Sequence, residues 1–192
     1  MHKKQTVFSA AVLALVVFCV FNAPVWSADG VIYLKNNIHA QQGRRDIKAS
    51  FANWTNPGAG HTIIPVNTAV IVDSSPSTFR RSVFSFTVQD SKKTVIMEYN
   101  EKLMGMSVDD YLKLITSPNP VALEKLSAAD QKGIKDGKAS IGMTKDGVRM
   151  ALGYPAVHMT PTLEDNKWTY WTNRFKSVVV EFDSSGKVIK TP

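Results

Sequence analysis

The sequence predicts an α+β protein with a β-rich N-terminal part and a C-terminal part in which short helices pack on a small antiparallel sheet. Between residues 31 and 99, short apolar runs alternate with polar residues and are separated by Gly, Pro, Asn and Ser. Residues 144–153 have helical spacing, and residues 168–190 return to a period of two. Pro118 and Pro120 mark the boundary, so we expect a leader over 1–28, a β-rich module ending in a helix over 29–117, and an α+β domain over 118–192.

The first 28 residues have the pattern of a secretory signal peptide. A basic start is followed by an almost unbroken apolar run over 7–21, and small residues precede a predicted cleavage site near Ser27 or Ala28. We therefore expect a periplasmic or envelope-associated mature chain. The alternative is an uncleaved membrane anchor, since the apolar run approaches the roughly 20 residues that span a bilayer. A lipoprotein is disfavoured because Phe18 stands before Cys19, where the lipid-attachment motif requires a small residue.

Composition limits the chemistry of the mature chain. Cys19 is the single cysteine, so cleavage leaves no disulfide, no thiolate nucleophile and no cysteine metal ligand. Cleavage also leaves 21 Lys and Arg against 16 Asp and Glu, a net charge of +5. The basic residues are dispersed, which indicates a solvated surface; the alternative is attraction to anionic lipid, lipopolysaccharide or an acidic partner. No basic run is dense enough to predict nucleic-acid binding.

The N-terminal module is expected to contain about five short strands. Residues 31–34 are the first; residues 45–54 are a longer one, with Ile47, Ala49 and Phe51 on one side. Pro65 makes its own segment an edge strand or a bend before residues 70–72. Residues 82–88 and 94–99 alternate as a hairpin. Together they predict a small β barrel or a strongly bent sheet. Residues 64–70 resemble the strand and turn of bacterial SH3-type modules.

Four helix starts are predicted between residues 107 and 144. Ser107 caps the first, with Asp110 in the capping-box position. A short helix follows Pro120, and Ser127 begins another turn with Asp130. Thr144 is the third N-cap, although Gly147 stands where a capping box has Glu.

The helix after Thr144 is short and leads into strands. Val148, Ala151 and Leu152 form one apolar stripe, and Gly153 and Pro155 end the helix. Downstream, Trp168 and Tyr170 share one face of a strand, with Trp171 on the other. Residues 178–182 and 187–190 are expected to pair across a turn at 183–186.

These C-terminal residues resemble the SmpA/OmlA domain, the fold of the small lipoprotein subunit of the bacterial outer-membrane β-barrel assembly machinery, which is related in shape to β-lactamase inhibitory proteins. The resemblance covers roughly the last third of the chain. It implies a non-enzymatic interaction domain located in the cell envelope. The matching residues are Gly142, Met143, Thr144, Lys145, Asp146, Val148, Leu152, Gly153, Tyr154, Pro155, Asp165, Trp168, Tyr170, Phe182, Asp183, Gly186, Lys187 and Val188.

The sequence offers little catalytic chemistry. His39, His61 and His158 have no second ligand at zinc-site spacing, so neither a metal nor a cofactor is expected. His61 and Asp73 could be combined with a serine as a catalytic triad, but there is no Gly-x-Ser-x-Gly elbow. We therefore predict no catalytic residue.

An aromatic and cationic group is the best candidate for a binding surface. By alternation, Trp171 lies opposite the core-facing Trp168 and Tyr170, and Arg174 and Phe175 follow within a few residues. Trp, Tyr and Arg dominate binding hot spots. We expect Trp171, Arg174 and Phe175 to form a partner-binding patch, with Asn53 and Trp54 as a second candidate.

The functional prediction is an exported, non-enzymatic interaction or assembly factor of the cell envelope. An inhibitor-like module that occludes an enzyme through its exposed sheet is the alternative. An envelope hydrolase that uses groups near His61 is a third reading, although the sequence offers it no nucleophile and base pair.

Overall fold

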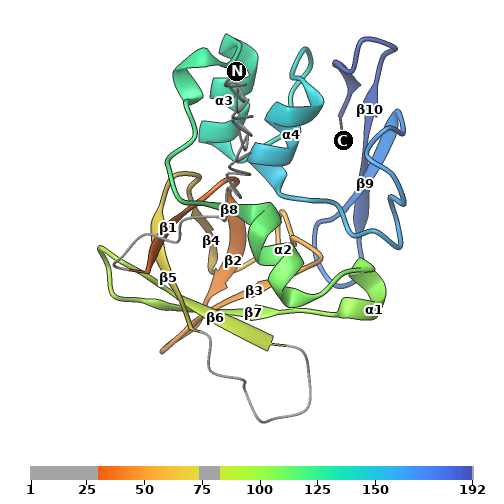
Figure 1. Cartoon of the computed structure of the whole chain (residues 1–192). Helices are drawn as coiled ribbons and strands as arrows, with labels where there is room; N and C mark the ends of the chain where they lie inside the picture. Colours follow the sequence, from red (N-terminus) through yellow and green to blue (C-terminus); the bar gives the residue numbers. More distant parts are fainter. Residues whose placement is uncertain (1–29, 74–82, 192) are drawn as a thin grey trace, which may run out of the picture.

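The computed structural model describes residues 30–73 and 83–191. The predicted leader, its cleavage site near Ser27 or Ala28, and Cys19 lie outside these residues. The described chain is α+β: one large sheet curls into a half-barrel, and a smaller sheet and a few short helices lie against it (Figure 1). Within residues 30–73 and 83–191, no helix has the length and apolar character needed to cross a membrane.

The larger sheet has eight strands in the order β4-β2-β3-β7-β6-β5-β1-β8. All neighbours are antiparallel except β3 and β7, which run parallel. The predicted bent sheet is therefore present. Its strands are β1 (Val31–Leu34), β2 (Ile38–Gln42), β3 (Ile47–Ser50), β4 (His61–Ile64), β5 (Ala69–Asp73), β6 (Val83–Val88), β7 (Thr94–Glu98) and β8 (Thr116–Ser117).

Three details of this sheet differ from the prediction, one of which is that the short strand β8 was not expected. The strand expected over 45–54 is confined to β3, because the chain turns at Asn53, whose φ is +46°. Strand β2 was not predicted. Its first three residues, Ile38, His39 and Ala40, are all buried, so this strand is covered on both faces and lacks the alternation that marks a half-exposed strand.

Other predictions for this sheet are confirmed. Ile47, Ala49 and Phe51 are all buried. The segment before Pro65 is β4, an edge strand, as the proline requires. Strands β6 and β7 form the predicted antiparallel hairpin, with Phe84 opposite Met97.

Short helices follow the larger sheet. The predicted helix after Ser107 is α2 (Val108–Ile115), and the Ser107 hydroxyl accepts from the Asp110 N–H. Helix α1 (Glu101–Met104) was not predicted; the Asn100 side chain caps it. The helix expected after Pro120 is only a 3-10 turn, η1 (Leu123–Lys125), and α3 (Ala128–Asp136) begins after Ser127 as predicted.

Helix α4 (Lys145–Leu152) has the predicted cap and apolar stripe. Thr144 Oγ1 accepts from the Gly147 N–H at 3.0 Å, and Val148, Ala151 and Leu152 are buried. The missing capping-box Glu is replaced by Asp130, whose Oδ1 accepts from the Thr144 N–H at 2.8 Å. Asp130 packs so tightly here that a Cβ on Gly147 would lie 1.9 Å from Asp130 Oδ1. Glycine is therefore required at position 147.

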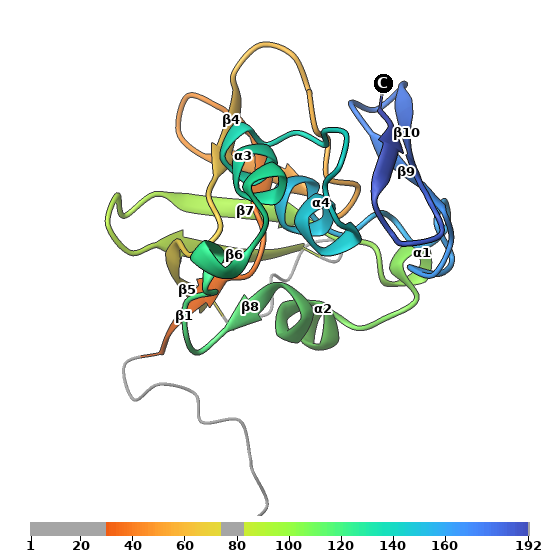
Figure 2. The same ribbon diagram turned by 90° about the horizontal axis from the view of Figure 1, so that it is seen from above.

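The smaller sheet has the order β11-β10-β9, all antiparallel, with β9 (Lys167–Trp171), β10 (Ser177–Phe182) and β11 (Val188–Lys190). Helix α4 lies between α3 and this sheet (Figures 1 and 2). Trp168 and Tyr170 are only 1% exposed and pack in the same core as the α4 stripe, as predicted.

Within the part of the chain that the structure describes, there are two hydrophobic cores, and neither draws its residues from one half of the sequence alone. The core of the half-barrel includes Tyr154 and Ala156 from beyond residue 118, and the core under the smaller sheet includes Val66 from the N-terminal half. Buried hydrogen bonds join the same parts: the Asn37 amide donates to the carbonyl oxygens of Ile134 and Ala151. The domain boundary near residue 118 stays a prediction.

Candidate functional site

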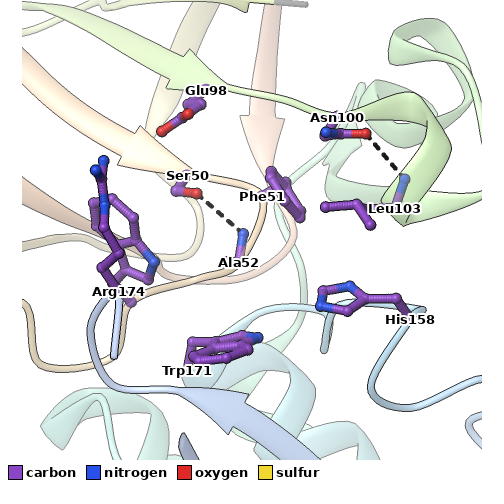
Figure 3. A pocket seen from close by; sticks show the side chains of 10 residues that line it. Ser50, Phe51, Ala52, Glu98, Asn100, Leu103, His158, Trp171 and Arg174 are labelled. Atoms are coloured by element: carbon purple, nitrogen blue, oxygen red, sulfur yellow. Dashed lines mark hydrogen bonds between the residues drawn. The ribbon is translucent and has the colours of Figure 1, made fainter. Parts of the chain in front are cut away.

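Four separate segments enclose a cleft of about 410 Å³ on the side of the molecule where β9 ends (Figure 3). They are the turn after β3, the junction of β7 and α1, the loop around His158, and the residues from Trp171 to Arg174. Because β3 and β7 are parallel neighbours, both deliver their last residues, Ser50 and Glu98, to the same edge. The site is therefore built where the half-barrel meets the smaller sheet.

Trp171 forms one wall of this cleft. It lies on the face of β9 opposite Trp168 and Tyr170, is half-buried, and packs against the core of the half-barrel. Its ring stacks on that of His158, with centroids 6.5 Å apart and an interplanar angle of 23°. Its carbonyl oxygen accepts from the Thr55 N–H at 2.9 Å, which joins the end of β9 to the turn after β3.

Trp54 and Arg174 come together at the rim. The Arg174 guanidinium carbon lies 5.8 Å from the centroid of the Trp54 ring, a cation–π arrangement. This pair lines the first cleft and also a second one of about 610 Å³, to which Phe175 belongs. The two predicted candidates, Trp171 with its neighbours and Trp54, thus form one continuous surface.

Phe175 is the most exposed large apolar side chain near the site, at 87%. A hydrogen-bonded turn fixes its backbone: Asn173 Oδ1 accepts from the N–H groups of Phe175 and Lys176, at 2.9 and 3.0 Å. Thr172 adds two hydrogen bonds to the Lys176 carbonyl oxygen. The ring is therefore held out from an ordered turn.

Asn53 lies inside the molecule, 0% exposed, and not on the surface. Its amide nitrogen donates to the Tyr154 carbonyl oxygen at 2.6 Å, and its side chain fills the space beside Gly153, where a Cβ would come within 2.5 Å of Asn53 Nδ2. The side chain thus links the turn after β3 to the end of α4. It positions Trp54 and does not itself contribute surface.

Sequence reasoning missed Ser50, Asn100 and His158, which also line the cleft. The sequence did hold one sign of a role for Asn100, because an Asn between a strand and a short helical segment is a good N-cap. Its Oδ1 accepts from the Leu103 N–H at 3.0 Å. The sequence holds no such sign for His158, because only the tertiary fold brings this residue next to Trp171.

The half-barrel contains a histidine pair that no spacing motif predicted. His39 Nδ1 and His61 Nε2 are 3.1 Å apart, and His39 Nε2 lies 2.9 Å from the Ala151 carbonyl oxygen. Because that carbonyl can only accept, His39 carries its proton on Nε2 and takes a hydrogen bond from His61 on Nδ1. Burial lowers the pKa of His39 to about 4 and also lowers the pKa of His61.

This pair bears on the catalytic triad that was considered for His61 and Asp73. Its hydrogen-bond partner is another histidine, whereas the Asp73 carboxylate accepts from the Ser85 hydroxyl at 3.3 Å. Within residues 30–73 and 83–191, no three His, Cys, Asp or Glu side chains gather as a metal site would require. What the cleft offers is an aromatic wall with a few polar groups, which is suited to binding.

Comparisons of the chain with protein-family models, with curated proteins and with solved structures found no match. The sequence, the fold and the geometry of the cleft are therefore the basis for assigning a function.

Proposed function

We propose that this protein is an exported, non-enzymatic interaction factor of the cell envelope that binds a protein partner through Trp54, Trp171, Arg174 and Phe175. The single observation that carries the proposal is Phe175, 87% exposed beside the Arg174–Trp54 pair. Trp and Arg are enriched in binding hot spots, and an aromatic anchor of this kind fits a pocket on a partner.

The ordered turn under Phe175 supports this role. Its backbone is already fixed by Asn173 and Thr172, so little conformational entropy is lost when the ring docks. A flexible loop with the same residues would lose more conformational entropy on binding. The surface is therefore preorganised for an interface.

The envelope location and the link to assembly rest on the sequence. The leader-like first 28 residues favour export, and the resemblance of the C-terminal third to the SmpA/OmlA domain favours an assembly partner in the outer membrane. Short helices on a three-stranded antiparallel sheet are compatible with that resemblance.

An in-cell crosslink tests the proposal. A photoreactive residue is placed at position 175 of the full-length protein, and the envelope is fractionated after irradiation. We expect discrete adducts in the membrane fraction. The matched control carries the same group at position 141, because Ile141 is also exposed, at 62%, but lies in the connection between α3 and α4. A soluble protein without adducts from position 175, or equal adducts from both positions, would contradict the proposal.

A further inference from the structure

The cleft beside Trp171 has the walls of a small-ligand site. Trp171, Trp54 and Phe51 supply aromatic surface, and His158 extends the wall by stacking on Trp171. In Figure 3, Trp171 and His158 lie across the cleft from Glu98 and Asn100. Concave sites that combine such apolar walls with a few placed polar groups are the usual binding sites for small molecules.

The polar groups in this cleft can both donate and accept. Asn100 Oδ1 accepts from the Leu103 N–H, so the Asn100 amide keeps its two hydrogens to donate, whereas Ser50 is buried and its Oγ accepts from the Ala52 N–H. Glu98 adds a carboxylate acceptor to the same lining. A ligand with several hydroxyl groups, each a donor and an acceptor, matches this mixture.

Charge in the lining selects for a neutral ligand. Glu98 and Arg174 have opposite formal charges, and the Arg174 cation already lies over the Trp54 ring. A site for phosphate or a polyanion would instead present an excess of positive charge. The flat C–H face of a sugar ring is apolar and suited to packing on an indole. The hydroxyl groups at the edge of the same ring are suited to hydrogen bonds with polar side chains.

We propose that this cleft binds a neutral saccharide, with one sugar ring against Trp171 and its hydroxyls toward Asn100 and Glu98. This cleft shares Trp54, Trp171 and Arg174 with the proposed partner-binding surface, but Phe175 lines only the neighbouring cleft. Phe175 is therefore the residue at which the two proposals can be tested separately.

The test is a titration of the full-length protein with three neutral trisaccharides: tri-N-acetylchitotriose, cellotriose and maltotriose. Tryptophan fluorescence and saturation-transfer NMR report binding. We expect saturable binding of at least one of them, with a Kd of about 1 mM or tighter. No saturable binding of any of the three trisaccharides would overturn the proposal.

Two variants separate binding from folding. Trp171→Phe keeps an aromatic ring in the core, and Asn100→Ser keeps an oxygen that caps α1 but loses the amide donor. We expect each to weaken saccharide binding at least about fivefold while the unfolding transition is retained. Phe175→Ala is the matched control and should bind the saccharide as the parent does. Unchanged affinity in both variants, or loss of saccharide binding in Phe175→Ala, would overturn the assignment.

Discussion

The two faces of strand β9 use the same kinds of residue for different purposes. On the inner face, Trp168 and Tyr170 are 1% exposed and pack against α4. On the outer face, Trp171 is half-buried and lines a cleft, and Phe175 beyond it is 87% exposed. Aromatic residues on the inner face therefore stabilise the fold, whereas those outside provide a surface. Substitutions can test this separation.

The largest effect is expected for Trp168→Ala on the inner face. Removing a fully buried indole leaves a cavity, so the free energy of unfolding should fall by about 3–5 kcal/mol, as measured by urea denaturation. The matched outer variant, Trp171→Ala, should lose less, since that ring is only half-buried. Equal losses would remove the distinction between the two faces.

Acidification should lower the free energy of unfolding through His39, which packs against helix α4. His39 donates to the Ala151 carbonyl oxygen of α4, and its pKa is lowered from 6.5 to about 4 by burial. Between these values the unfolded chain binds more protons than the folded chain, so stability is full above pH ~6.5 and falls as the pH drops toward about 4. The loss attributable to His39 should be about 3 kcal/mol.

Urea denaturation at pH 7.5 and at pH 4.5 measures this loss, and His39→Gln provides the control. A glutamine cannot titrate, so the variant should be less stable at pH 7.5 but show a flatter dependence on pH. His61, whose pKa is also lowered, contributes in the same direction. If the free energy of unfolding of His39→Gln depends on pH as steeply as that of the parent, groups other than His39 cause the pH dependence.

A smaller inner effect is expected for Tyr170→Phe. The Tyr170 hydroxyl donates to the Gly153 carbonyl oxygen at 3.1 Å in a buried place, and the substitution leaves that acceptor without this donor. The free energy of unfolding should fall by about 1–2 kcal/mol in the same denaturation assay. Full retention of stability would show that another donor replaces the hydroxyl.

The smallest effect on stability belongs to the outermost residue. Phe175→Ala should change the free energy of unfolding by no more than about 0.5 kcal/mol, because its ring buries little surface. A photoreactive residue at position 171 of the Phe175→Ala variant should nevertheless give fewer partner adducts than the same residue in a chain that keeps Phe175. A large loss of stability would place Phe175 with the inner face after all.

Local patterns predicted the inner face better than the outer one. Alternation identified Trp168 and Tyr170 as core, and Thr144 and Ser107 were found from their capping positions. Such signals are local, because a strand or a helix start shows its environment within a few residues. The alternation also placed Trp171 on the opposite face, but it could not show that this face borders a cleft.

Long-range contacts explain what was not predicted. Asn53 was a surface candidate, yet it is buried because it bonds to Tyr154, about a hundred positions later in the chain. His158 reaches Trp171 through tertiary packing, and β2 is hidden from pattern analysis because both its faces are covered. The parallel pairing of β3 with β7 brings Ser50 and Glu98 to one edge, and no local signal announces that pairing.

Asp130 couples the stability of helix α3 to that of helix α4. Its carboxylate accepts hydrogen bonds from the Ser127 hydroxyl at the start of α3 and from Thr144 at the start of α4. One side chain therefore holds the first turns of both helices, and neither can fray there without releasing a contact of the other. The two helices should open as one cooperative unit in native-state hydrogen exchange, with matching protection and a common response to denaturant.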